Sequence, residues 1–149
     1  MHGNGFGRCK RHESGFLMNP QAHTPPLDGH RQQVADTRAT AGPGGRTYAA
    51  PFANVWDRLE AEIGARRGWT LVHADEERGL FTVVCRNLVP PGTDDLSVWV
   101  RLDEFGLTRV DMRSSARGGR RDFGTNQRRV ASLIRALDKA LGPGHRVRR

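Results

Sequence analysis

A dense group of polar side chains, RVDMRSSARGGRRDFGTNQRRV, fills residues 109–130 between two hydrophobic segments. It contains seven arginines, whose planar guanidinium groups pair with carboxylates and phosphates through two parallel hydrogen bonds. Two kinds of chemistry fit these residues. The arginines either bind an external anion or pair with carboxylates of the same domain and hold neighbouring elements together.

An external anion or partner would meet arginines, a hydroxyl group and an amide at this strand-to-helix corner. Backbone N–H groups at the start of a helix, together with nearby arginines, attract a phosphate or a carboxylate. An Arg-rich sheet face that also carries a tryptophan would extend the same surface. The candidate binding residues are Arg113, Ser114, Arg117, Arg120, Arg121, Asn126, Arg129, Trp99 and Arg101.

The favoured interpretation of the corner is structural. Asp122 is suited to cap the following helix, and a carboxylate in that position removes much of the attraction for an external anion. Arg113, Arg117 and Arg129 would then pair with carboxylates of the same domain, joining the last strand to the last helix. The expected structural network consists of Asp94, Asp95, Asp111 and Asp122.

The polar face of the sheet is a second candidate surface. Alternation along the strands predicts that Trp99, Arg101, Arg109 and Arg113 point the same way, with Asp111 among them. Aromatic and Arg side chains on a sheet can stack RNA bases, although such modules usually present two or three aromatics. A Trp among arginines also suits a protein interface.

Other patterns point only weakly to chemistry. The outline G-x-x-x-x-G at 119–124 lacks the Lys of a phosphate-binding loop, and adjacent Asp94 and Asp95 would point apart on a strand. His73 is expected to pack or lie at the surface, and Cys85 to be a buried thiol. Zinc accepts Cys and His ligands, and the N-terminal segment contains Cys9, His12, His23 and His30. Their spacing does not fit a zinc-binding motif, so we expect them to be incidental. We therefore expect no catalytic residues, no metal and no cofactor.

Two helices are predicted to position the polar corner. The first follows Pro51 and ends before Gly68, and the second covers about 122–141 with Asp122 as its N-cap and Gly142-Pro143 as its stop. The first helix has a stripe of Phe52, Val55, Trp56, Leu59 and Ile63. The stripe of the second consists of Phe123, Val130, Leu133, Ile134, Leu137 and Leu141.

Strands are predicted between these helices at 69–74, 80–87, 96–102 and 107–115, with a loop at 89–95 and a possible short strand at RTYAA, residues 46–50. Short turns imply antiparallel neighbours, and one apolar face per strand implies a sheet covered on one side. The predicted fold class is α+β: an antiparallel sheet of four to five strands with two helices packed on one face, in the order (β)-α-β-β-β-β-α.

The formal net charge of +8 comes mostly from the ends of the chain. Residues 1–46 form a Gly/Pro/His/Arg-rich segment that we expect to be disordered, 47–142 a single α+β domain, and 143–149 a basic, solvated C-terminal tail. The composition predicts no membrane span and no signal peptide, so cytoplasmic localisation is expected.

The segment from Tyr48 to Leu141 resembles the bacterial domain-of-unknown-function family numbered 1499. In family terms the pattern is a DD-V-x-V-R strand, then V-D-x-R-S-x-S-R, then D-x-G-x-N-x-x-R-I. The matching positions are Asp94, Asp95, Val98, Arg101, Asp111, Arg113, Ser114, Arg117, Asp122, Gly124, Asn126 and Arg129. Ala116 replaces the second Ser of the pattern, and residues before Tyr48 do not match it. The resemblance implies no known activity.

The leading functional hypothesis is a non-enzymatic domain that binds an unidentified protein or anionic ligand through the Arg-rich corner and the polar sheet face. The second is an RNA-binding module that uses the same surface and the basic tails, although a nucleic acid partner is not favoured. The third is an enzyme of unrecognised type with a site near Asp94, Arg113 and Asn126.

Overall fold

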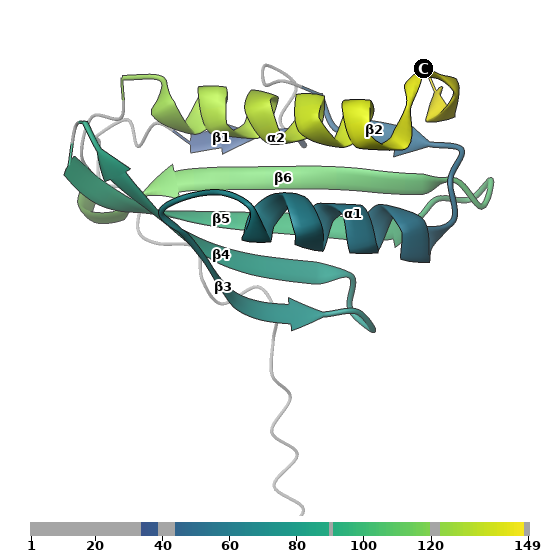
Figure 1. Ribbon diagram of the computed structural model, residues 1–149, viewed down its shortest axis with the longest axis horizontal. Coiled ribbons are helices and arrows are strands. Elements are labelled where there is room, and N and C mark those ends of the chain that lie inside the picture. The colour runs from purple at the N-terminus through teal and green to yellow at the C-terminus, as the bar shows by residue number, and fades with distance from the viewer. Residues whose placement is uncertain (1–33, 39–43, 90, 120–122, 148–149) are drawn as a thin grey trace, which may run out of the picture.

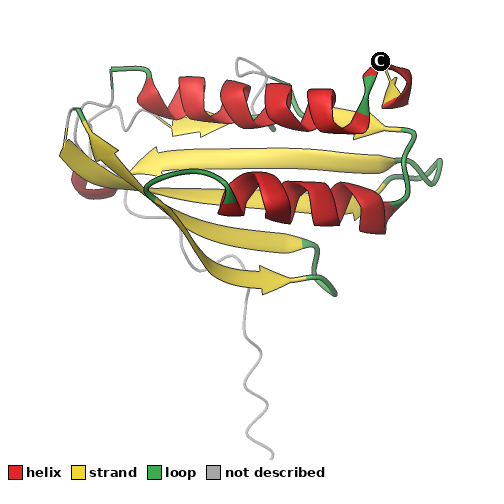
Figure 2. Cartoon of the chain, viewed as in Figure 1, coloured by secondary structure: helices red, strands yellow, loops and turns green. Residues whose placement is uncertain are grey.

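Two helices lie on one face of an antiparallel sheet (Figure 1). The computed structural model describes residues 34–38, 44–89, 91–119 and 123–147. The elements in chain order are β1 (Val34–Asp36), β2 (Arg46–Tyr48), α1 (Phe52–Gly64), β3 (Trp69–Asp75), β4 (Leu80–Leu88), β5 (Pro91–Leu102), β6 (Thr108–Ala116), the 3-10 turn η1 (Arg117–Gly119), α2 (Thr125–Leu141), the 3-10 turn η2 (Pro143–His145) and β7 (Arg146–Val147). The α+β class, the antiparallel sheet and the two helices are therefore confirmed (Figure 2).

The sheet has seven strands, more than the four to five predicted. Its order is β3-β4-β5-β6-β2-β7, with β1 also paired to β6. The predicted short strand at 46–50 is present as β2, whereas β1 and β7 were not predicted. Strands of two or three residues contain too little alternation to be recognised, because they form where the edge of a longer strand offers unpaired backbone groups.

β1 and β2 lie along the same edge of β6, one after the other. Ala35 pairs with Ser114 and Thr47 pairs with Arg109, and the chain between them leaves the sheet at Thr37. The described residues 34–38 thus contradict the disorder expected for residues 1–46, while 1–33 and 39–43 lie outside the described residues. β7 likewise corrects the expected solvated tail, because Arg146 and Val147 pair with β2.

β4 and β5 form a hairpin with a shorter turn than predicted. β5 begins at Pro91, inside the loop expected at 89–95, and Leu88 pairs directly with Pro91. Continuous pairing then runs from this end of the hairpin to the partners Leu80 and Trp99. The sequence does not predict a strand at Pro91 and Gly92, because both residue types are rare within strands.

The core lies between the helices and the inner face of the sheet. The stripe of α1 packs there, and the Trp56 ring stacks on Phe81 with centroids 3.8 Å apart. Alternation along the strands predicts ten inward residues, and nine of them are at most 2 % exposed: Phe81, Val83, Cys85, Leu96, Val98, Val100, Thr108, Val110 and Met112. The tenth, Leu102, ends β5 and is 57 % exposed, so that part of the prediction is wrong. Each fully buried large side chain contributes about 1.5–3 kcal/mol, so this layer supplies most of the stability.

α2 starts three residues later than predicted, at Thr125. The N-cap residue is Gly124, with φ 78°. The prediction that Asp122 is the N-cap is therefore wrong. Phe123, expected in the apolar stripe, lies before the helix and is 65 % exposed. The stripe instead begins with Asn126 and Arg129, two polar residues that are buried.

Asp138 joins the C-terminal part of α2 to the strand edge. Its carboxylate accepts a 2.7 Å hydrogen bond from the Tyr48 hydroxyl and lies 3.5 Å from Arg46 and 3.9 Å from Arg146. Burial, followed by this hydrogen bond, raises the pKa of Tyr48 well above its usual value. These contacts explain how a two-residue β7 stays on the sheet. No helix in the described part of the chain has both the length and the apolar character needed to cross a membrane.

Candidate functional site

β5 and β6 divide the polar motif between the two faces of the sheet. Successive residues of a strand point to opposite faces, so Asp94 and Ser114 face the helices while Asp95 and Arg113 face away from them. The side chains that point away from the helices form what we call the outer face. On β4, β5 and β6 it consists of Leu80, Thr82, Val84, Arg86, Leu88, Pro91, Thr93, Asp95, Ser97, Trp99, Arg101, Arg109, Asp111, Arg113 and Ser115.

A buried polar network lies on the helix side. It consists of Asn87, Asp94, Ser114, Asn126 and Arg129. Arg129 Nη2 donates to Asp94 Oδ2 and to Asn87 Oδ1, both at 2.7 Å, and its Nη1 donates to Ser114 Oγ at 2.8 Å and to Asn126 Oδ1. The Ser114 hydroxyl donates to Asn126 Oδ1 at 2.7 Å, and Asn87 Nδ2 donates to Asp94 Oδ2 at 2.6 Å.

This network joins α2 to three strands. The side chains of Arg129 and Asp94 are only 5 % and 1 % exposed, so water reaches neither charge freely. A buried ion pair adds little by comparison with apolar packing, but removing one partner leaves an unpaired buried charge and costs about 3–5 kcal/mol. The network therefore specifies how α2 sits on the sheet.

Cys85 lies inside the same region and is a buried free thiol, as predicted. Burial raises the pKa of this thiol to about 11, with the charge of Arg129 lowering it and that of Asp94 raising it less strongly. The side chain is therefore neutral near pH 7 and packs as a small apolar group.

A second cluster surrounds Asp111 on the outer face. Its carboxylate is 2 % exposed and accepts hydrogen bonds from Arg101 Nη2 at 3.2 Å, Arg109 Nε at 3.0 Å and the Thr37 hydroxyl at 3.2 Å. The backbone N–H of Met112 donates to Thr37 Oγ1 at 2.8 Å. Thr37 thus bridges the backbone and the carboxylate of β6 from the segment between β1 and β2.

Gly45 explains how this segment can lie so close to Asp111. A Cβ atom at residue 45 would be 2.2 Å from Asp111 Oδ1 and 2.9 Å from the Val110 carbonyl oxygen. Any larger residue would displace the carboxylate or the backbone. The close approach leaves room only for glycine.

Trp99 is half-buried, and its ring is covered by Arg38. The guanidinium carbon of Arg38 lies 4.1 Å from the ring centroid, and the same side chain donates to both oxygens of Asp36, at 3.1 and 3.0 Å. Burial raises the pKa of Asp36, but the hydrogen bonds and charge of Arg38 and the charge of Arg113 outweigh it, so the net pKa is lowered.

Arg113 occupies the middle of the outer face. It lies opposite Ser97 on one side and Asp36 on the other, at register positions of β5 and β1. Within the described part of the chain it forms no ion pair, although Asp36 and Asp111 both lie on the same face. Arg117, in contrast, donates twice to the Asp95 carboxylate at 3.0 and 2.6 Å, in an exposed pair.

The structure separates the residues that the sequence grouped together. Asp94 and Asn126 meet in the buried network, whereas Arg113 lies on the opposite face, so the three do not form one site. Arg120, Arg121 and Asp122 lie outside the described residues, as do the zinc candidates Cys9, His12, His23 and His30. His73 is exposed on β3, 3.8 Å from Asp75. The described residues contain no group of three potential metal ligands.

The sequence did not single out several residues that complete the clusters. No local sequence pattern indicates the roles of Thr37, Gly45 and Asp138, because their contacts join parts of the chain more than 60 residues apart. Asn87 was detectable, since the inward alternation of Phe81, Val83 and Cys85 continues to it. A polar residue at an inward position predicts a buried hydrogen-bonding partner.

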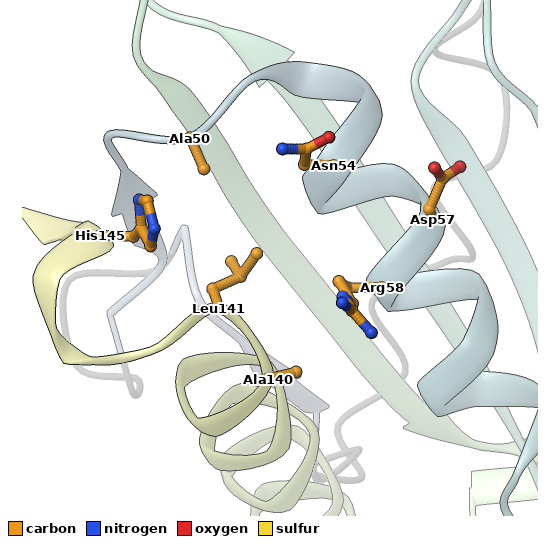
Figure 3. Close-up of a pocket in the computed structure, with 7 residues that line it drawn as sticks. All are labelled: Ala50, Asn54, Asp57, Arg58, Ala140, Leu141 and His145. Carbon is orange, nitrogen blue, oxygen red and sulfur yellow. The ribbon is translucent and has the colours of Figure 1, made fainter.

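A shallow groove of about 390 Å³ separates the start of α1 from the end of α2. Figure 3 shows Asn54 and Arg58 of α1 on one side and Leu141 and His145 on the other. Ala50, Ala140 and Asp57 complete the lining, and the polar residues among these are exposed to solvent. The groove therefore has no buried polar group that would fix a small ligand.

Fold and geometry together define a class of protein: an α+β domain whose C-terminal helix is bonded to an antiparallel sheet by a buried Arg–Asp–Asn–Ser network. The chain belongs to the family described as Protein of unknown function (DUF1499), whose model matches residues 20–137. The predicted family is thereby confirmed, and the match begins well before Tyr48, so it includes β1 and Thr37. No curated protein matches the chain.

Proposed function

We propose that this protein is a non-enzymatic binding domain whose outer face, centred on Arg113, binds an acidic surface of a protein partner. The observation that carries the proposal is that both helices cover the same face of the sheet (Figure 1). Within the described residues, no helix covers the outer face of β4, β5 and β6, where Thr37 and Arg38 lie against Asp111 and Trp99. A broad face that carries a half-buried Trp and several arginines has the composition of a protein interface.

The charge of this face supports an acidic partner. The outer residues of β4, β5 and β6 include four arginines and two aspartates. Both aspartates are already paired, Asp111 with Arg101 and Arg109 and Asp95 with Arg117. Arg113 and Arg86 form no ion pair in the described part of the chain, so their guanidinium groups remain for carboxylates of a partner.

A protein partner is favoured over RNA by the position of Arg38. Base stacking needs an accessible aromatic face, and Arg38 already lies over the Trp99 ring at 4.1 Å. Trp99 is also the one aromatic residue among the outer positions of β4, β5 and β6. The enzyme hypothesis gains no support, because Asp94 and Asn126 are enclosed and Arg113 is on the other face.

Binding of poly-L-glutamate, as a simple acidic polypeptide, tests this proposal by NMR titration of the full chain. We expect the largest amide shifts on β4, β5 and β6 around Arg113. We expect Arg113→Gln to weaken binding by about fivefold or more, because it removes a central cation that forms no ion pair within the described residues. Arg135→Gln is the matched control, since Arg135 is an exposed arginine on α2.

Equal weakening by Arg113→Gln and Arg135→Gln would contradict the proposal, because it would mean that only net charge matters. Shifts confined to the tails would contradict it as well. Tighter binding of poly(U) RNA, lost in Trp99→Ala, would favour the RNA-binding alternative instead.

A further inference from the structure

We propose that one end of the molecule docks on the surface of an anionic lipid bilayer. This end, which we call the hairpin end, consists of Leu88 and Val89 at the β4–β5 turn, Phe123 before α2, and the exposed arginines Arg86 and Arg128. Arg86 and Leu88 also belong to the outer face, so variants of Val89 and Phe123, which are not outer-face residues of β4, β5 or β6, separate this proposal from the outer-face proposal.

Three large apolar side chains project into solvent at the hairpin end. Leu88 and Val89 are each 89 % exposed, and Phe123 is 65 % exposed. Adjacent branched apolar residues at the tip of a hairpin cannot be buried by their own strands, because the chain reverses there. Their exposure is costly in water and favours insertion into an apolar or interfacial environment.

The backbone holds Phe123 outward. It is the one non-glycine residue with positive φ in the described part of the chain, at 48°, and Gly124 follows with φ 78°. Left-handed backbone is unfavourable for a residue with a Cβ atom, and such conformations concentrate at sites of function. Two left-handed residues in succession direct the ring away from the apolar stripe of α2, which the sequence pattern had predicted it would join.

The buried network connects the two parts of the hairpin end. Asn87, the residue before Leu88, bonds to Arg129 in the second turn of α2, and Asp94 bonds to both. The hairpin tip and the entry to α2 are therefore fixed at the same end of the sheet, as Figure 1 shows on its left side. The three apolar side chains therefore lie at one end of the sheet.

The charge around the apolar side chains matches an anionic surface. Arg86 and Arg128 are exposed, and Arg117 is balanced by Asp95. Exposed apolar side chains at the same end of the sheet as exposed arginines fit the boundary between acyl chains and anionic headgroups, where both the apolar and the ionic contacts are satisfied.

Vesicle co-sedimentation of the full chain tests this proposal. We expect binding to vesicles of phosphatidylcholine mixed with phosphatidylglycerol, weak binding to phosphatidylcholine alone, and release by salt. Val89→Asp and Phe123→Asp should each lower binding about tenfold, because a carboxylate opposes insertion and is repelled by the lipid. Circular dichroism of each variant checks that the fold is kept.

Phe105→Asp is the matched control for the apolar residues. Phe105 is 64 % exposed, almost the same as Phe123, but it lies in the β5–β6 turn at the opposite end of β5. For charge, the pair Arg86→Gln and Arg128→Gln is compared with Arg78→Gln and Lys139→Gln, which remove the same charge at the other end. We expect strong losses only at the hairpin end.

Four results would overturn the proposal. The first is that neither kind of vesicle binds the chain, and the second is that neutral vesicles bind it as well as anionic ones. The third is that Phe105→Asp weakens binding as much as Phe123→Asp, which would indicate attachment through net charge or the tails. The fourth is a concentration-dependent dimer that Val89→Asp abolishes, which would identify a second copy of the chain as the occupant of the hairpin end.

Discussion

Asp94 and Asp95 are neighbours in the chain but have opposite surroundings. Asp94 is 1 % exposed and accepts hydrogen bonds from Asn87 and Arg129, whereas Asp95 is partly exposed and pairs with Arg117. The same alternation separates Ser114, which is buried, from Arg113. A motif that reads as one polar group therefore contains two sets of side chains, one that holds α2 on the sheet and one that faces outward.

Asp36 should give the stability of the protein a measurable pH dependence. Its folded pKa is lowered from 3.8, so its contribution is complete above the pKa of the unfolded chain and is lost as the pH falls through the folded pKa. In urea unfolding, we expect the advantage of the wild type over Asp36→Asn to be present at about pH 6 and to shrink below about pH 4.

NMR titration of the Asp36 carboxyl provides the control for that experiment. Arg38→Gln should raise the pKa of Asp36, because Arg38 provides the hydrogen bonds and the largest nearby positive charge. A stability difference that stays constant across the pH range, or a carboxyl that titrates above its ordinary value, would disagree with the structure.

At the scale of elements, β1 and β2 act as two parts of one edge. Thr37, after β1, donates a hydrogen bond to the Asp111 carboxylate, and Gly45, before β2, lies close to the same carboxylate. The backbone N–H of Gly45 donates to the Thr37 carbonyl at 3.3 Å. The edge of β6 is therefore paired on both sides of Asp111, and the Asp111 carboxylate is enclosed.

Gly45→Ala should destabilise the protein by about 1–3 kcal/mol, because the added methyl group meets the Asp111 carboxylate and the Val110 carbonyl. Gly44→Ala is the matched control, since a Cβ atom there would have no neighbour within 4 Å. The measurement is the free energy of urea unfolding. Equal effects of the two substitutions would show that Gly45 is not closely packed.

The long elements were predictable from sequence because they contain several periods of an apolar pattern. Apart from Leu102 at the end of β5, the inward residues of β4, β5 and β6 and the stripe of α1 lie where alternation or helical spacing predicts. β1, β7 and the start of β5 were missed, since their pairing depends on distant backbone and not on side-chain pattern. The start of α2 was misplaced because two left-handed residues, Phe123 and Gly124, intervene after Asp122.

At the scale of the whole molecule, both helices lie on one face of the sheet, and in the described part of the chain no helix lies on the other face (Figure 1). The sequence identified most motif residues of the buried network and of the Asp111 cluster. It could not show how they are distributed, because Asp94, Asn126 and Arg129 come together only through tertiary pairing. Of the two proposed binding surfaces, the hairpin end depends on the buried network, because the Asn87–Arg129 hydrogen bond joins the end of β4 to α2.

The central claim is that the inward half of the motif joins α2 to the sheet. Urea unfolding of Asp94→Ala, Arg129→Ala and the double variant tests it most directly, with Arg128→Ala, an exposed neighbour, as the control. We expect each single change to cost about 3–5 kcal/mol, the double variant to cost at least about 2 kcal/mol less than their sum, and Arg128→Ala to cost under about 0.5 kcal/mol. Additive losses, or an Arg129→Ala variant as stable as Arg128→Ala, would contradict the claim.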